Sequence, residues 1–315
     1  MRLIKLPSDT NFSFMKYWKL GFTISTVLSV VSVILFFAVG MNYGIDFQGG
    51  TLVEVQTKDG PADIAAIRSD IGELNLGDVQ IQEFGAPDDV LIRVVRQPGG
   101  EDAQQRAVQL IRDMFGDTVE FRRVEVVGPR VSAELAQAGV LAVIAALLAI
   151  MVYIWLRFEW HFAIGAVITT VHDVLLTIGI FAVVQLEFNL TIIAAVLTIV
   201  GYSLNDTVVV YDRLRENLRR YKKMPMAELI DLSINQMLSR TVMTSLTTLI
   251  ALIALFIFGG EVIRSFTFAM IWGVAIGTYS SIFVAAPLLI WFNLRPDNKA
   301  DADTTEAPVA DGAAS

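Results

Sequence analysis

The hydrophobic positions of this chain fall into six long runs that are separated by polar segments. Each run holds about 20 residues or more with almost no charged side chain, which is the length that an α-helix needs to cross the apolar core of a bilayer. The runs cover residues 20–42, 136–156, 161–185, 188–211, 238–258 and 266–293. The pattern therefore predicts a polytopic α-helical membrane protein with six transmembrane helices.

The first run could instead belong to a signal peptide. The apolar core of a signal peptide has roughly 7–15 residues, and this run is longer. We interpret residues 20–42 as a helix that stays in the protein and anchors it.

The segment between the first two runs has the pattern of a small folded domain. Within residues 46–134, alternating apolar positions predict four strands, and apolar residues at helical spacing predict one helix from Pro61 and another around Ala107. The strands are expected at residues 51–56, 79–84, 90–95 and 119–127. Their order, βαββαβ, is that of the ferredoxin-like arrangement, so we expect one α+β ferredoxin-like domain between the first two spans.

The basic residues of the short loops predict the orientation. The connection 212–237 carries six Lys and Arg residues, and residues 1–19 carry four. Cytoplasmic loops are enriched in Lys and Arg, and with six spans these two segments lie on the same side. We therefore expect both termini in the cytoplasm and the domain at 46–134 on the opposite, periplasmic side.

The composition supports a membrane protein and adds little else. Hydrophobic residues make up 54% of the chain and charged residues 18%, whereas a soluble protein has about a quarter charged. The net charge of −8 comes partly from residues 296–315, an Ala-, Asp- and Pro-rich segment that we expect to be a disordered cytoplasmic tail. The chain has no cysteine, so no disulfide braces the exported segment.

The exported segment shows no signature of catalysis or nucleic-acid binding. Residues 46–134 contain no His/Cys metal spacing, Gly-rich phosphate loop or nucleophile elbow, and their basic residues are scattered among acidic ones. We expect no enzymatic activity, no metal, no cofactor and no nucleic-acid partner.

Three charged residues lie inside the apolar runs, where each costs roughly 2.5–3.5 kcal/mol on insertion scales and usually marks an ion or proton path. Asp206 lies in the fourth run, Arg240 near the start of the fifth, and Asp173 near the middle of the third. Asp206 and Arg240 are expected at similar depth. Supporting polar residues lie nearby on the same helices, namely Ser203, Asn205, Thr244 and Thr247.

Each of these charges also has a structural interpretation. Asp206 and Arg240 could form a static ion pair, and Arg240 could snorkel to the interface. Asp173, between Thr169 and Thr177 at helical spacing, could serve helix packing, and we expect His172 to point elsewhere as a spectator. The functional interpretation is a proton relay, because a buried carboxylate takes up a proton more readily when its cationic neighbour moves away.

Four sequence motifs resemble the SecF branch of the SecD/SecF protein-export family. They are GIDFQGG (44–50), VGPRVSAEL (127–135), GYSLNDTVVVYDRLREN (201–217) and SRTVMTSLTTLIALIALFIFGG (239–260). The match covers roughly residues 15 to 293 and includes the six-span layout. Asp46, Phe47, Gly49 and Gly50 lie in the first motif. The family's Asp and Arg that are implicated in proton transport correspond to Asp206 and Arg240.

The resemblance implies a function and a set of partners. Family members belong to the proton-driven RND superfamily of the bacterial inner membrane and use the proton motive force to promote protein export. The implied partners are SecD, the SecYEG channel, YajC, YidC, the exported unfolded polypeptide, protons and membrane lipid.

Other functions stay open from the sequence. A half-size RND-type exporter of lipids or small molecules and a non-conducting scaffold of the translocon are the alternatives. An intramembrane aspartyl protease is disfavoured because its Gly-x-Gly-Asp motif reads Ser-Leu-Asn-Asp at 203–206. The sequence leaves open whether His172 and Asp173 join the relay.

Overall fold

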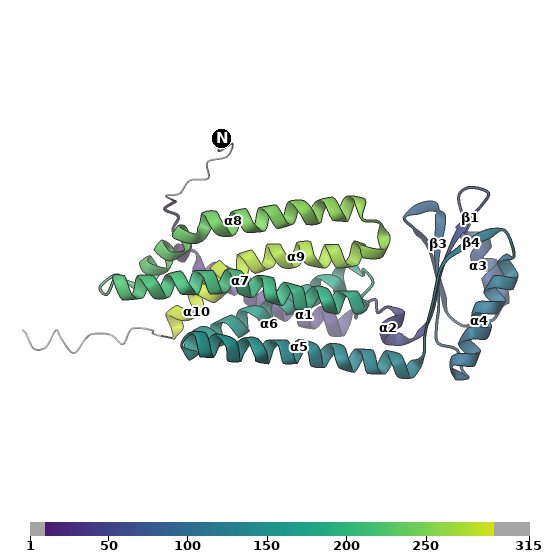
Figure 1. Cartoon of the computed structure of the whole chain (residues 1–315), viewed down its shortest axis with the longest axis horizontal. Helices are drawn as coiled ribbons and strands as arrows, with labels where there is room; N and C mark the ends of the chain where they lie inside the picture. The colour runs from purple at the N-terminus through teal and green to yellow at the C-terminus, as the bar shows by residue number, and fades with distance from the viewer. Residues whose placement is uncertain (1–9, 293–315) are drawn as a thin grey trace, which may run out of the picture.

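A computed structural model describes residues 10–292 of the 315-residue chain. The expected tail at 296–315 therefore lies outside the described residues, as does part of the expected N-terminal segment. The described chain consists of a long helical bundle with a small α/β unit at one end (Figure 1).

Six helical segments of the described chain are long and apolar enough to cross a membrane, which confirms the six predicted spans. The last of them contains α9, a π-helical turn and α10 in succession. The segments are α1 (Trp18–Ala38), α5 (Pro129–Arg157), α6 (Trp160–Val184), α7 (Leu190–Arg220), α8 (Met226–Phe258) and η2 (Glu261–Ile263) with α9 (Arg264–Ser280), η3 (Ser281–Ala285) and α10 (Ala286–Trp291). A short 3-10 helix, η1 (Phe14–Lys16), precedes α1.

Several helices extend beyond the predicted apolar ranges. Hydropathy detects the part of a helix that lipid would surround, whereas hydrogen bonds and packing continue the helix into its polar ends. Asn217, near the end of α7, donates to Ser233 Oγ at 2.9 Å and to Gln236 Oε1 at 2.8 Å near the start of α8. These contacts hold the two polar helix ends together.

Three helices form the centre of the bundle. The apolar stretches of α6, α7 and the last span are 56%, 44% and 67% buried within the chain, against 17%, 11% and 11% for α1, α5 and α8. Small residues allow the close approach, since a Cβ at Gly273 of α9 would lie 2.2 Å from Ile199 Cγ1 of α7. The central helices are therefore the place where buried polar groups can meet.

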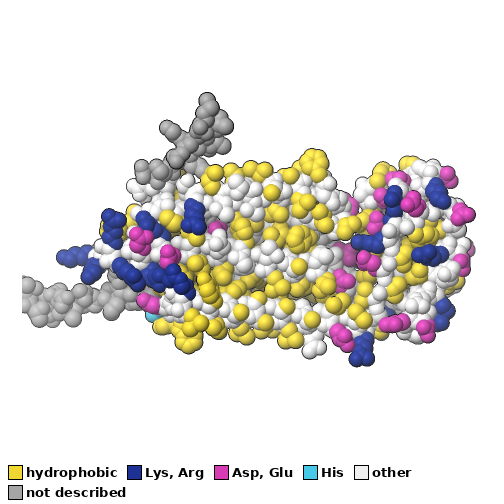
Figure 2. Space-filling model, in the orientation of Figure 1, with side chains coloured by type: hydrophobic (Ala, Val, Ile, Leu, Met, Phe, Trp, Pro, Cys, Tyr) yellow, Lys and Arg dark blue, Asp and Glu magenta, His cyan; other side chains and the backbone are white. Residues whose placement is uncertain are grey.

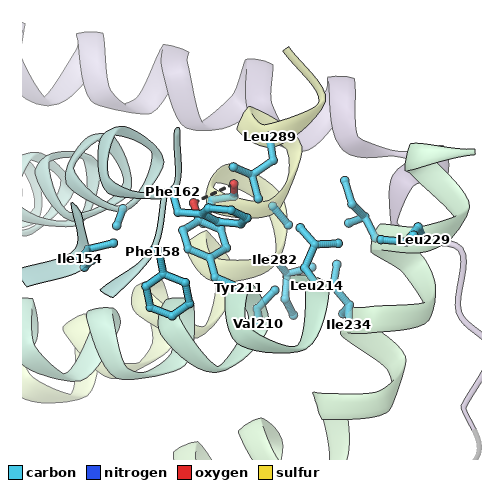
Figure 3. Close-up of a cluster of buried hydrophobic side chains, with 14 of the residues drawn as sticks. Ile154, Phe158, Phe162, Val210, Tyr211, Leu214, Leu229, Ile234, Ile282 and Leu289 are labelled. Atoms are coloured by element: carbon cyan, nitrogen blue, oxygen red, sulfur yellow. Dashed lines mark hydrogen bonds between the residues drawn. The ribbon is translucent and has the colours of Figure 1, made fainter. Parts of the chain in front are cut away.

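A cluster of apolar side chains closes the bundle at the end away from the α/β unit (Figure 3). Tyr211 of α7 is fully buried there, packs edge-to-face on Phe162, and donates from Oη to Ala285 O at 3.1 Å. Ala285 ends the π-helical turn that precedes Pro287, a residue that cannot donate a backbone hydrogen bond.

The α/β domain, which we define as residues 50–127, has the predicted ferredoxin-like order. It consists of β1 (Gly50–Thr57), α3 (Ile64–Glu73), β2 (Val79–Phe84), β3 (Ala86–Val94), α4 (Gly100–Phe115) and β4 (Val119–Val127). The antiparallel sheet has the order β2-β3-β1-β4, with both helices packed on one face. The opposite face carries Leu52 and Leu91, which pack with Ile45 on the membrane side of the domain.

Two local predictions for this domain were wrong in detail, namely the start of its first helix and the length of the loop before β3. The first helix starts at Ile64 rather than at Pro61, because the Asp63 carboxylate caps it and accepts from the N–H groups of Ala65 and Ala66. Strand β3 starts directly after Gly85, whose φ of +85° permits a tight turn in place of a five-residue loop.

The cluster in Figure 3 gives a stability prediction. Replacing Tyr211 by Phe should lower the free energy of unfolding by about 1–2 kcal/mol. The buried hydrogen bond from Tyr211 Oη is lost, and the Ala285 carbonyl loses a donor. Thermal unfolding in detergent measures this. Tyr153→Phe, at a position that is 57% exposed on α5, is the matched control, and equal effects of the two variants would contradict the prediction.

Candidate functional site

The buried polar side chains of the bundle gather between α6, α7 and α9. Asp173 on α6 and Asp206 on α7 are 1% and 3% exposed, so both predicted carboxylates lie inside the protein. The two carboxylates differ in how many of their oxygens have a hydrogen-bond partner.

Asp173 is held by three side chains. Its Oδ2 accepts from Ser203 Oγ at 2.5 Å and from Ser280 Oγ at 2.8 Å, and its Oδ1 lies 2.8 Å from His172 Nδ1. The Thr177 hydroxyl donates to the Asp173 carbonyl at 2.8 Å. Both carboxylate oxygens therefore have partners, contributed by three different helices.

The expectation that His172 points away from Asp173 was wrong. Successive residues on a helix lie about 100° apart, but Nδ1 is close enough to the backbone to reach the neighbouring carboxylate. The other ring nitrogen, Nε2, is buried and has no hydrogen-bond partner in the described part of the chain. The imidazole is thus joined to the polar cluster through Nδ1.

Ser203 contacts Asp173 rather than Asp206. Helical spacing puts Ser203 on the same face of α7 as Asp206. The packing of the neighbouring helices, α9 among them, determines which carboxylate its hydroxyl reaches. A Cβ at Gly277 would lie 3.1 Å from Ser203 Cβ, so this glycine lets α7 and α9 approach. The Gly273, Gly277 and Ser280 spacing on the last span is the sequence signal that could have located the contact.

Asp206 is only partly satisfied. Its Oδ2 is buried and has no hydrogen-bond partner among the described residues, and Thr278 of α9 lies beside the carboxyl group. Arg240 is close enough to attract the carboxylate, but within the described residues no ion pair of 4.0 Å or less joins the two. The predicted static pair is therefore not formed in this conformation.

A row of hydroxyls leads away from Asp206. Thr278 Oγ1 lies 2.7 Å from Ser245 Oγ, and Tyr202 Oη donates to Ser245 Oγ at 3.4 Å. These residues come from α9, α8 and α7. Sequence reasoning missed Ser245 and Thr278 because isolated hydroxyls in apolar helices are common and only the helix packing brings these together.

Arg240 lies on an exposed part of α8 and lines a cavity of about 360 Å³ between the ends of α5, α7 and α8. Asp212, Arg213 and Glu216 line the same cavity. The charged lining is compatible with water, so Arg240 lines a polar space while its charge still acts on Asp206.

The remaining supporting residues lie apart from the carboxylates. Thr244 donates to Arg240 O at 2.9 Å and Thr247 to Met243 O at 2.9 Å, so each hydroxyl is engaged by its own helix. Asn205 lies exposed on the outer face of α7. The structure does not bring these three side chains to Asp206.

The predicted motif residues form a joint between the α/β domain and α7. They lie in and beside α2 (Ile45–Gln48), where Asp46 Oδ2 accepts from Leu190 N, the first residue of α7, at 2.8 Å. Phe47 packs on Phe188, with ring centroids 5.7 Å apart. Gly50 has φ +131°, and a Cβ there would lie 2.5 Å from Val94 O.

A cleft of about 400 Å³ lies beside this joint, between the domain and the ends of the helices. Within it, Arg93 of β3 and Glu187 of the α6–α7 loop form an ion pair at 2.6 Å. Burial raises the pKa of the Glu187 carboxyl, and the attraction of Arg93 only partly offsets this effect.

The Asp46 contact gives a second prediction. Asp46→Ala should lower the free energy of unfolding by about 1 kcal/mol, because the N-terminus of α7 loses an acceptor. Asp46→Asn keeps an oxygen that can accept from Leu190 N and should lose less than half of that amount. Chemical unfolding in detergent measures both; a larger loss for Asn than for Ala would contradict the capping role.

Comparison with known proteins matches this chain to one family. The model of the protein-export membrane protein SecD/SecF C-terminal family matches residues 107–295, and that of the SecD/SecF GG motif matches residues 34–60. The protein translocase subunit SecF of Rickettsia rickettsii is 46% identical over 93% of this chain and 96% of that protein. SecF of Rhodobacter capsulatus is 45% identical over 99% of this chain and 98% of that protein.

Fused relatives are also similar. The protein translocase subunit SecDF of Brucella abortus is 46% identical over 98% of this chain, which spans 41% of that protein. The crystal structure of SecDF, a translocon-associated membrane protein from Thermus thermophilus, matches with a TM-score of 0.82 at 34% identity, over 94% of this chain and 40% of that one. The family models, the near-complete match to separate SecF subunits and the shared fold agree: this chain belongs to the SecD/SecF family of protein-export membrane proteins.

Proposed function

We propose that this chain acts with SecD in the bacterial inner membrane and uses the proton motive force to promote export of unfolded polypeptides. Its relatives are named protein translocase subunits, and the energy-coupling role is the part that we add. The observation that carries the proposal is Asp206, a carboxylate that is buried inside a membrane helix and has one oxygen without a partner.

A carboxylate in this position suits reversible protonation. If Asp206 served packing alone, its oxygens would be satisfied as those of Asp173 are. Arg240 lies near but unpaired, so a small helix movement would bring the two charges together or apart. The carboxylate would release its proton when the guanidinium approaches and bind one when it withdraws.

The surroundings give the proton a route. The Thr278 hydroxyl lies beside Asp206 and contacts Ser245, and Arg240, whose charge acts on Asp206, lines the cavity between the ends of α5, α7 and α8. Each proton that crosses would deliver about 2.3 kcal/mol per 100 mV of membrane potential. Asp173, whose Oδ1 lies 2.8 Å from His172 Nδ1, is the second titratable group that we assign to this relay.

The surface charge is consistent with the proposed orientation. Lys and Arg side chains gather at the end of the bundle away from the α/β domain, which carries mixed charges (Figure 2). Basic residues favour the cytoplasmic side, so we place the termini in the cytoplasm and the α/β domain in the periplasm.

An exposed face of α7 supports the partnership with SecD. Ala194, Thr198, Gly201 and Asn205 share this face and are all exposed in the isolated chain. Small and polar residues at this spacing are typical of close helix packing in membranes. The fused SecDF relatives place SecD and SecF in one chain, and we assign this face to the SecD half. SecYEG, YajC and YidC are further partners that we propose from the family resemblance.

One observation favours the alternative of a lipid exporter. An apolar groove of about 480 Å³ lies between α1, α2, α5, α6 and α7, with Phe36, Phe47 and Val140 in its walls. A lipid exporter would use such a groove for an acyl chain and would show gradient-dependent lipid release. The near-complete match to SecF subunits favours polypeptide export.

The proposal is tested by export in membrane vesicles with an imposed proton gradient. Asp206→Asn should abolish the gradient-dependent part of export, because the amide cannot carry a proton, whereas Asp206→Glu should keep a measurable part. Expression and SecD association are matched among the variants. Glu228→Gln, which removes an exposed carboxyl from the polar part of α8, should leave export unchanged. Full gradient dependence in Asp206→Asn would reject the relay and favour a non-conducting scaffold.

A further inference from the structure

One ion pair connects the α/β domain to the membrane-spanning part. Among the described residues, Arg93–Glu187 is the single ion pair that joins β3 to the α6–α7 loop. The two side chains are 12% and 21% exposed, and Arg93 Nη1 also donates to Asn42 Oδ1 at 3.3 Å. Asn42 in turn donates to Gln185 O at 3.0 Å. The contact is therefore a small network that involves the domain, the segment before it and the loop.

The domain has only two covalent connections to the bundle, and each contains glycine. Gly49, with φ of +73°, lies between α2 and β1, Gly50, with φ of +131°, begins β1, and Gly128 lies between β4 and α5. Glycines can absorb a change of backbone angles at a hinge. A tilt of the domain about these positions would separate the Arg93–Glu187 pair and shift the packing of Ile45 on Leu52 and Leu91.

A tilt of the domain would reach α7 through α2. Ile45 of α2 packs on Leu52 and Leu91 of the sheet, and Asp46 of the same short helix accepts from Leu190 N at the N-terminus of α7. Helix α7 carries Asp206, 16 residues further on, or about 24 Å along the axis at 1.5 Å per residue. A helix transmits a shift along its axis because its hydrogen bonds keep its length constant.

We propose that the Arg93–Glu187 pair and Asp46 form a releasable latch, which couples the docked position of the α/β domain to α7 and so to the proton step at Asp206. The coupling rests on the function proposed above, whereas the latch itself rests only on the contacts at the joint. Arg93, Glu187 and Asp46 act in it as positioning residues.

The cleft offers both latch residues other partners after release. Its lining includes Arg123, whose Nε lies 3.5 Å from Glu54 Oε2 and 3.6 Å from Glu125 Oε1, together with the Glu261–Arg264 ion pair of the last span. Charges of both signs therefore surround the pair, and a domain that tilts can exchange one set of ion pairs for another. Such exchange is how interfaces acquire two discrete positions.

The Glu187 carboxyl gives the latch a pH dependence of defined sign. Arg93, Asp46, Arg123 and Glu125 are the charged groups that act on it, and burial still raises its pKa above the ordinary value of 4.5. The docked position thus holds a proton more readily than a released one in which the Glu187 carboxyl is less buried, whichever cation it then faces. By linkage, lowering the pH toward 4.5 stabilises the docked position, and raising the pH favours release.

The test measures the distance between the domain and the bundle. Because the chain has no cysteine, Val39→Cys and Asp113→Cys introduce two specific sites for spin labels, at exposed positions directly after α1 and on α4. The protein is reconstituted in vesicles with a cysteine-free SecD, and double electron–electron resonance gives the distance distribution. Arg93→Glu places two carboxylates together and should increase the population at longer distances by about threefold or more. The charge swap Arg93→Glu with Glu187→Arg should restore the native distribution.

Two further measurements distinguish a contact that releases from one that stays formed. In the native protein the docked population should rise as the pH falls, and Glu187→Gln should abolish this dependence. Gradient-dependent export should fall in Arg93→Glu and recover in the charge swap, at equal thermal stability.

Each outcome has a definite meaning. An unchanged distance distribution in Arg93→Glu overturns the latch. A changed distribution with unaltered export overturns the coupling to the proton step. If the native protein shows no gradient-dependent export while the distances respond, the proposed function and the coupling both fail, and the docking contact alone is supported.

Discussion

The bilayer core has no water to satisfy a polar group, and this constraint organises the whole membrane part of the protein. A hydroxyl, imidazole or carboxylate inside a span is stabilised by a partner on its own or a neighbouring helix. Many of the buried polar residues therefore collect where α6, α7 and α9 meet, with Ser245 of α8 in contact with Thr278, whereas the exposed sides of α1, α5 and α8 present mainly apolar side chains. Glycines at positions such as Gly273 and Gly277 bring the central helices close enough for those partners to touch.

Two carboxylates meet this constraint in different ways. Asp173 has a partner for each oxygen, from Ser203, Ser280 and His172, and so it holds three helices together. Asp206 keeps an oxygen without a partner in an equally buried place. A protein gains no stability from an unsatisfied carboxylate, which is the physical reason to connect Asp206 with a proton rather than with packing.

Helix α7 joins the separate parts of the molecule. Its N-terminus is capped by Asp46 from the joint under the α/β domain, its middle carries Asp206, and its far end packs through Tyr211 into the cluster of Figure 3. A single rigid element thus reaches from the domain to the opposite end of the bundle. The residues of the Gly-Gly segment matter for this arrangement because they place both the hinge and the helix cap within a few positions of each other.

The sequence by itself determined the six spans, the ferredoxin-like order and the charged residues inside the spans, because apolar length, strand alternation and isolated charges are local features. The prediction that Asp173 and Asp206 lie inside the protein follows from the same local reasoning. Only the tertiary structure decided which residues meet. Ser203 bonds to Asp173 instead of supporting Asp206, His172 turns toward Asp173, and Arg240 lies near Asp206 without pairing. These contacts depend on how closely and at what rotation neighbouring helices pack, and the periodicity of one helix holds no information about the position of another.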